Sequence, residues 1–191
     1  MQVTTGEGIH IELLWTTPND PDETDEGPTA GADLDLHFTH PFAVSRDTNG
    51  DGVPEPWFDG QYDAFWFNPH PNWGSLDPAV DDDPRLDRDD TDGAGPENLN
   101  VQAPEAATYR IGVHAWSDHG YGPSYATVRV YVYGEPVFAW EDVELLPCAL
   151  WEVGALSWPS GTVAPQLDAA GQGPRILPGY SHPNFPTDCG H

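Results

Sequence analysis

The stretch TYRIGVHAWSDHGYGPSYATVRVYVYG, residues 108–134, decides the fold class of this chain. Its two ends, 108–116 and 125–134, are rich in β-branched and aromatic residues and alternate between apolar and polar positions, which is typical of half-buried β-strands. The turn-forming residues SDHGYGPS lie between them. We therefore expect the two segments to pair as an antiparallel hairpin.

Similar segments lie on both sides of this hairpin, at residues 9–17, 32–41, 62–68, 135–145 and 150–161. The 21 Pro and 20 Gly interrupt the chain too often for long helices. The sequence predicts an all-β protein, an antiparallel β-sandwich of the jelly-roll kind with long acidic loops, over residues 1–161. Residues 162–191 are rich in Pro and Gly and have no periodicity, so we expect a C-terminal tail packed on the domain or extending from it.

The two cysteines, Cys148 and Cys189, lie far apart in the sequence and near its end. No CxxC motif or Cys/His zinc spacing surrounds them. A disulfide that ties the tail to the domain is the preferred interpretation, and two free buried thiols are the alternative.

Charge is the dominant feature of the composition: 32 Asp and Glu stand against six Arg, with no Lys, for a net charge of −26 at pH 7. Such a field repels nucleic acids and acidic membrane surfaces and attracts cations. No run of 18 apolar residues is present, so membrane insertion is not expected. The first ten residues lack the features of a signal peptide, so any export signal is absent from this sequence.

The acidic residues are clustered, since 21 of the 32 lie in residues 20–35, 47–63 and 77–97. Proteins of salt-rich habitats also carry many acids, but these are dispersed over the surface. Here the segment 108–133 contains only one acid, Asp118. Clustering in loops favours metal binding over an adaptation to salt.

The clearest metal-binding pattern is DTNGDGVPE, residues 47–55, which places oxygen donors at positions 1, 3, 5, 7 and 9 of a calcium loop with Gly52 at position 6. Phe58 occupies position 12, where an EF-hand needs Glu. The pattern instead resembles the shorter calcium loops of extracellular repeat proteins and dockerin-like modules. A solvated Asn-Gly turn is the alternative. The predicted ligands are Asp47, Asn49, Asp51, the carbonyl of Val53, and Glu55.

A second set of candidate calcium ligands comes from the acidic loop 77–100 and the strand 32–41. Nine acids in the loop repel one another, and calcium would convert this repulsion into an ordering force. Alternation in the strand places two carboxylates and His37 on one face, where they could meet a neighbouring acidic loop. A strand with a solvated polar face is the alternative. These candidate ligands are Asp33, Asp35, Asp87, Asp89, Asp90 and Asp92.

Catalytic motifs are absent from the sequence. The eight His form no HExxH motif, and no GxSxG motif is present. Any pair chosen from so many acids would be arbitrary as a glycosidase pair. The sequence therefore predicts no enzymatic activity. Four Trp that flank acidic loops could stack on a sugar or hold a peptide, although burial in the core is the more common role: Trp57, Trp66, Trp73 and Trp116.

The segments ADLDLHFTHP, YDAFWFNPHPNWG, DRDDTDGAGPENLN and residues 108–134 resemble β-sandwich modules of secreted bacterial proteins. These modules are common in myxobacteria and are similar to pre-peptidase C-terminal and collagen-binding-type domains. The resemblance covers roughly residues 9–160. It implies an extracellular, non-catalytic jelly-roll module that binds calcium structurally and docks onto a polymer or a partner protein. The loop 47–55 and the Cys-containing tail depart from that group, and no peptidase or hydrolase is attached.

The sequence thus predicts a non-catalytic calcium-binding module located outside the cell or at its surface. Its partners are expected to be calcium ions and a polysaccharide or protein. The alternative is a subunit that assembles with other copies of itself, through calcium, into a surface layer or filament. An enzyme of carbohydrate metabolism is a third possibility, for which no catalytic carboxylate can be identified.

Overall fold

Two antiparallel sheets make up the described part of the chain. The computed structural model describes residues 8–25, 27, 30–47, 51–77, 79–88 and 94–184. Eleven strands occur among these residues: β1 (Ile9–Thr16), β2 (Asp33–Thr39), β3 (Asp63–Ala64), β4 (Arg85–Arg88), β5 (Glu97–Val101), β6 (Thr108–Ser117), β7 (Ser124–Val132), β8 (Glu135–Leu145), β9 (Leu150–Ser157), β10 (Thr162–Pro165) and β11 (Arg175–Leu177).

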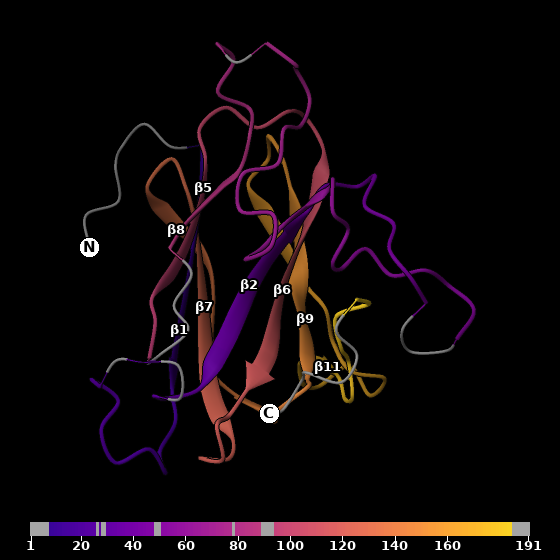
Figure 1. Cartoon of the computed structure of the whole chain (residues 1–191). Coiled ribbons are helices and arrows are strands. Elements are labelled where there is room, and N and C mark those ends of the chain that lie inside the picture. The colour runs from indigo at the N-terminus through magenta and orange to yellow at the C-terminus, as the bar shows by residue number, and fades with distance from the viewer. Residues whose placement is uncertain are drawn as a thin grey trace.

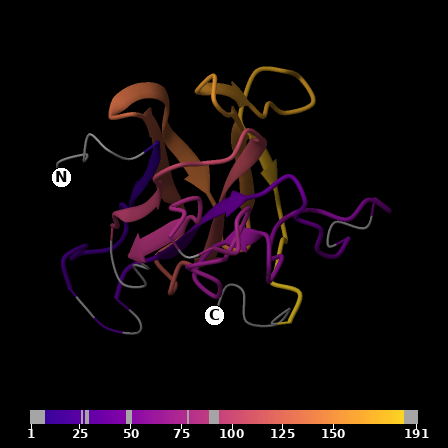
Figure 2. The same ribbon diagram turned by 90° about the horizontal axis from the view of Figure 1, so that it is seen from above.

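The sheets lie face to face as a β-sandwich, which confirms the predicted fold class. One sheet has the strand order β4-β5-β1-β7-β8, and the other has the order β10-β9-β6-β2-β3 with β11 also paired to β9. The two layers are separate in Figure 1 and in the view from above in Figure 2. The predicted hairpin between residues 108–116 and 125–134 is wrong, because β6 pairs with β2 and β9 whereas β7 pairs with β1 and β8 in the other sheet. The finer name of jelly roll stays a prediction.

The core between the sheets follows from the alternation in the strands. Ile9, Ile11, Leu13 and Trp15 of β1 are all buried in it. The predicted inward face of β2 is confirmed, since Leu34, Leu36 and Phe38 belong to the same cluster. From β6, the inward residues are Tyr109, Ile111, Val113 and Ala115.

Two strands lie inside the acidic segment that the sequence reading treated as a loop without periodicity. On β5, Leu99 and Val101 pair with the inward residues Ile11 and Ile9 of β1, and Glu97 pairs with Leu13, so the first inward position of the strand is an acid. The Glu97 carboxylate accepts a hydrogen bond of 2.6 Å from the backbone N–H of Leu36 in the opposite sheet. β3 pairs with β2 only at Phe38 and Thr39, so no strand carbonyl faces Leu36 on that side. The Glu97 carboxylate accepts the hydrogen bond from Leu36 N–H instead.

Two short strands, β10 and β11, lie within the expected C-terminal tail of residues 162–191. Both β10 and β11 pair with the outer edge of β9, at Gly154–Ser157 and Leu150–Glu152 respectively. A backbone hydrogen bond of 3.1 Å joins Arg175 N–H to the carbonyl of Gln166, which closes the intervening loop. Short strands at a sheet edge carry little hydrophobic alternation, so their pattern does not distinguish them from a loop.

A second apolar cluster covers the outer face of the sheet that contains β2 and β6. We call it the outer cluster; it comprises Trp57, Phe58, Phe65, Leu150 and Tyr180, with Trp66 and Leu177 packed against it. Most of its residues come from the long segment between β2 and β4, which extends away from the sandwich on one side in both views (Figures 1 and 2). The predicted polar face of β2 is therefore buried rather than solvated.

Cys148 is disulfide-bonded, and no free cysteine occurs among the described residues. Its expected partner, Cys189, lies outside the described residues, so the pairing of these two cysteines stays a prediction. In the part of the chain that the structure describes, no helix has the length and apolar character needed to cross a membrane.

The close packing of the Trp57 ring on Gly112 should make any side chain at position 112 destabilising. A Cβ atom at Gly112 would lie 2.7 Å from the Trp57 ring, so the indole would have to move. We expect Gly112→Ala to destabilise the protein by about 1–3 kcal/mol in urea unfolding. Gly60→Ala is the control, because a Cβ there meets no atom within 4 Å, and its effect should stay within about 0.5 kcal/mol. Equal effects of the two substitutions would contradict this packing.

Candidate functional site

The predicted calcium loop is closed at its base by backbone hydrogen bonds. Ser45 N–H donates to the carbonyl of Glu55 at 2.7 Å, and Glu55 N–H donates to the carbonyl of Arg46 at 3.3 Å. Within the loop, Gly52 has a φ of 87°, a left-handed conformation that glycine adopts without strain. The loop therefore turns back sharply at the glycine that the sequence pattern identifies.

Three of the five predicted ligands converge in this loop. One ligand atom from each of Asp47, Asp51 and Glu55 lies within 4.8 Å of the other two. Asp47 Oδ2 also accepts a 2.7 Å hydrogen bond from Gly52 N–H, and Asp51 Oδ1 accepts one of 2.8 Å from Val53 N–H. These bonds orient the two aspartates on the loop. Of the other two predicted ligands, Val53 is exposed, and Asn49 lies outside the described residues.

Glu55 joins the loop to the body of the protein. Asp47 and Asp51 are exposed, whereas Glu55 is only 7% exposed. Tyr180 donates a long hydrogen bond of 3.5 Å from its hydroxyl to Glu55 Oε2. Nearby, Arg46 donates from Nη1 to the carbonyl of Pro183 at 2.9 Å. The acidic loop is therefore held from below by the C-terminal segment 180–184.

The described members of the second set of predicted ligands, Asp33, Asp35 and Asp87, do not join the first set in one site. Among the described residues, Asp47, Asp51 and Glu55 are the one group of three or more Asp, Glu, His or Cys side chains with such close ligand atoms. Asp33 and Asp35 lie on β2, and Asp87 lies on β4 in the other sheet. The remaining predicted ligands, Asp89, Asp90 and Asp92, lie outside the described residues.

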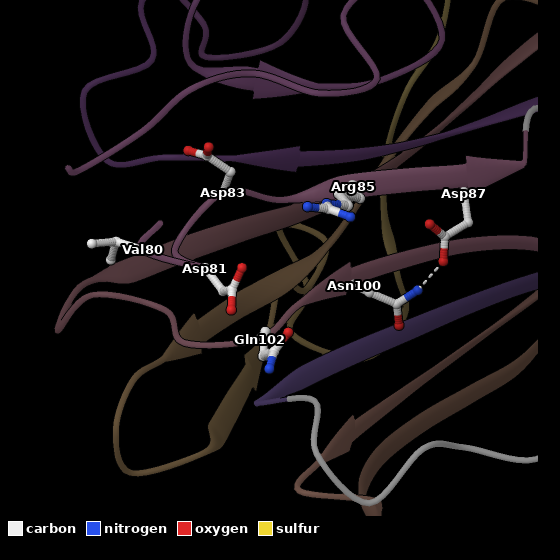
Figure 3. Close-up of a pocket in the computed structure, with 7 residues that line it drawn as sticks. All are labelled: Val80, Asp81, Asp83, Arg85, Asp87, Asn100 and Gln102. Atoms are coloured by element: carbon white, nitrogen blue, oxygen red, sulfur yellow. Dashed lines mark hydrogen bonds between the residues drawn. The ribbon is translucent and has the colours of Figure 1, made fainter. Parts of the chain in front are cut away.

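Asp87 instead lines an acidic pocket of about 300 Å³ beside β4 and β5. Figure 3 shows the guanidinium of Arg85 between Asp83 and Asp87, and Asp81 nearer to Gln102. The side-chain amide of Asn100 donates to Asp87 Oδ2. The carboxylates of this pocket are thus spread apart, with an arginine among them, and do not converge on one point.

Asp35 lies under the outer cluster, where buried histidines and carboxylates meet. His114 is paired with Asp35 in the strand register, and its Nδ1 lies 3.7 Å from Asp35 Oδ2. The Nε2 of His114 donates to the carbonyl of Tyr180 at 2.8 Å. His37, two residues from Asp35, shares a 2.7 Å hydrogen bond with Asp63 Oδ2. Asp35 is therefore placed for internal polar contacts and not for a cation site at the surface.

Asp63 is the polar centre of this region. Its Oδ2 also accepts a 2.7 Å hydrogen bond from Phe58 N–H, and Phe58 has a positive φ of 63°. A phenylalanine rarely adopts this conformation, so the bond to a buried carboxylate compensates for local strain. The ring of Phe58 then packs edge-on against His37 and His114, with centroids 4.7 and 5.2 Å apart.

Burial shifts the protonation equilibria of these groups. Desolvation holds the pKa of His37 well below its usual value, and the nearby positive charge of His114 would lower it further. Burial lowers the pKa of His114 from 6.5 to about 4. The pKa of His182 falls from 6.5 to about 4 because of burial and, secondarily, the charges of His37, His114 and Arg46. Burial raises the pKa of Asp63 well above its usual value.

The sequence pattern placed Asp35 and His37 on one face of a strand, but it did not bring His114, His182 or Asp63 to them. His37 and His114 lie on neighbouring strands, while His182 follows the last strand by five residues. Only the antiparallel pairing of β2 with β6 and the return of the C-terminal segment bring them together. The sequence offers one indication of this site. Asp35 and His37 alternate with apolar residues on β2, so both lie on the face of the strand opposite the main core.

Comparisons with known proteins add little to this geometry. No protein-family model matches the chain, and no curated protein matches it. The fold is similar to that in a crystal structure described as "unknown function protein SAV2460", with a TM-score of 0.47 and 17% sequence identity over 95% of each chain. A likeness at this level carries no argument about function. The fold and site define a β-sandwich with a carboxylate-bearing loop anchored to its outer cluster.

The buried histidines predict a loss of stability in mild acid. A base whose pKa is lower in the folded than in the unfolded state takes up a proton on unfolding at any pH between the two values. For His114 and His182, that window runs from about 6.5 down to about 4. The free energy of unfolding should fall through this range, by up to about 3 kcal/mol for His114 alone.

Unfolding in urea at several pH values would measure this effect. His114→Gln keeps an amide that can donate to the Tyr180 carbonyl but does not titrate, so its stability should depend less on pH than that of the wild type. His70→Gln is the matched control, because His70 is exposed, and it should preserve the wild-type slope. A slope unchanged in His114→Gln would show that this histidine does not titrate on unfolding.

Proposed function

We propose that this chain is a non-catalytic, calcium-binding β-sandwich module that works outside the cell or at its surface and binds a polymer or a partner protein. The convergence of Asp47, Asp51 and Glu55 carries the proposal. The spacing of the sequence selects these residues, and the fold independently brings their carboxylates within 4.8 Å of one another. The ion would sit among hard oxygen ligands, which suit calcium.

Electrostatics supports a cation in this loop. Three carboxylates at this separation repel one another, and Glu55 is nearly buried, where solvent screens the repulsion less. A divalent cation would turn the repulsion into attraction. The carbonyl of Val53 and the side chain of Asn49 are the further oxygen donors that the sequence pattern offers. Water would complete the six to eight ligands that calcium takes.

A structural role follows from the position of Glu55. Trp57, the first outer-cluster residue, comes two positions later, and Tyr180 contacts Glu55 directly. An ion that fixes Glu55 would therefore stabilise the covering segment as well as the loop. The large negative charge of the chain would attract such an ion from solution.

Thermal unfolding in chelator and in millimolar CaCl2 tests the proposal. Calcium at 100 times its Kd would stabilise the folded state by about 2.7 kcal/mol, which corresponds to a rise in Tm of roughly 5–10 °C for a chain of this size. Asp51→Asn should abolish most of this rise, because it removes one ligand charge. Asp25→Asn, a change of equal charge at an exposed acid outside the loop, should preserve it.

Two results would refute the calcium site. A similar rise of Tm in molar NaCl without calcium would mean that general screening of the acidic surface is responsible. Equal losses in Asp51→Asn and Asp25→Asn would mean that calcium acts on the whole charge and not on the loop.

The alternative function, a subunit assembled through calcium, predicts that the protein grows in size when calcium is added. The strand β8 forms one edge of its sheet and carries Pro136, Glu141, Glu144 and, with a positive φ of 56°, Asp142. Proline, charge and backbone irregularity at an edge oppose strand pairing between copies. We therefore expect an unchanged elution volume with calcium in size-exclusion chromatography, and a calcium-dependent shift to larger species would favour assembly.

A further inference from the structure

A groove of about 390 Å³ lies over the paired strands β6 and β9. Arg110 of β6 is opposite Ala155 of β9 in the register. Arg110 is exposed while its neighbours Tyr109 and Ile111 are buried in the core, so the groove is on the outer face of the sheet. Ala155 contributes only a methyl group to this face, which leaves the surface hollow between larger residues on either side.

The walls of the groove come from segments that cover the sheet. Trp57 of the outer cluster lines it, and so do Gln166 and Arg175 from the C-terminal segment. Gln166 N–H donates to the carbonyl of Val153 at 3.1 Å, and Arg175 N–H donates to that of Gln166 at 3.1 Å. Backbone hydrogen bonds therefore hold both of these side chains at the groove. Its volume is in the range of small-molecule sites.

Glu152, the acidic residue that lines the groove, is neutralised by another lining residue. Both carboxylate oxygens of Glu152 have partners, because Oε2 pairs with Arg175 Nε and Oε1 accepts a hydrogen bond of 3.4 Å from Trp57 Nε1. The pair with Glu152 uses only the Nε of Arg175, and a guanidinium has two further nitrogens. The groove is thus rich in hydrogen-bond donors and poor in uncommitted acceptors.

Arg110 gives the groove a positive charge that no described carboxylate neutralises. It makes no ion pair with any described residue, although the chain holds 32 acids and six Arg. Arg129 on the other sheet shows the contrast, since it pairs with Glu12 at 3.3 Å and Glu141 at 3.6 Å. With two Arg and one Glu among its lining residues, the groove carries a net charge of the opposite sign to the whole protein.

We infer that this groove binds a sugar residue that carries a carboxylate, through the guanidinium of Arg110. The inference rests on the proposed function as a binding module and names the ligand that the module takes. The carboxylate pairs with Arg110 in the bidentate geometry that a guanidinium favours. Gln166 and Thr108 offer groups for the sugar hydroxyls, and Ala155 offers apolar surface for the ring.

The net charge of the chain limits the kind of polymer. At −26, the protein repels a long polyanion. The Debye length is about 8 Å at physiological ionic strength, so distant acids are screened. A single carboxylate in the groove therefore interacts mainly with the nearby arginine. The favoured ligand is therefore an isolated uronic-acid residue in an otherwise neutral polysaccharide.

Isothermal titration of the full chain with glucuronate tests the inference, with glucose and acetate as the other two titrants. We expect saturable binding of glucuronate at least about tenfold tighter than that of either glucose or acetate. Arg110→Gln should weaken glucuronate binding by about tenfold or more, as expected for the loss of a charge-assisted hydrogen bond. Arg85→Gln makes the same change of charge at the acidic pocket near β4 and should change the affinity less than about twofold.

Four results would overturn the inference. They are the absence of glucuronate binding, binding of glucose with equal affinity, binding of acetate with equal affinity, and equal weakening by the two arginine substitutions. Equal binding of acetate would redirect the search to protein C-termini.

Because no lining residue of the groove is a predicted calcium ligand, glucuronate should also bind in chelator. Glucuronate binding in chelator, together with no effect of calcium on Tm, would support the groove and refute the calcium site. An effect of calcium on Tm without glucuronate binding would support the calcium site and refute the groove.

Discussion

The close packing of Trp57 on Gly112 is the contact on which the described architecture outside the main core depends. Because Gly112 has no side chain, the indole lies against the strand itself, where a Cβ atom would come within 2.7 Å of the ring. This contact holds the segment after β2 onto the outer face of the sheet. Two residues before Trp57 lies Glu55 of the acidic loop, and the indole itself lines the β6–β9 groove. The Trp57–Gly112 contact therefore lies next to both the candidate ion site and the candidate ligand site.

Covering a sheet with a second apolar cluster has a physical consequence, because the outer positions of β2 and β6 include ionisable residues. Burying a charge is unfavourable unless it is paired or the group becomes neutral. Asp63 meets this condition through His37 and the backbone of Phe58, and His114 meets it through the carbonyl of Tyr180. The lowered pKa values of the histidines are the result of this burial. The same arrangement makes the packing of the covering segment sensitive to the protonation of His37, His114 and His182.

Charge is distributed unevenly over the structure. Three carboxylates gather in the loop at Asp47, whereas those of the pocket near β4 are spread around Arg85. The groove, by contrast, holds two of the six arginines. Acidity alone thus does not identify a site in this chain. The informative features are the convergence of oxygens on one point and a positive charge with no acidic partner among the described residues.

Composition and alternation alone determined the fold class, the main strands and the apolar face of β2, because a strand that covers one core must alternate with a period of two. Spacing also selected Asp47, Asp51 and Glu55, since a short loop constrains its own geometry. Only the tertiary structure decided that the other face of β2 is buried, that Glu97 starts a strand, and that residues 162–177 extend the sheet. These depend on contacts between residues far apart in the chain, such as Trp57 with Gly112 and Glu97 with Leu36, which local pattern does not encode.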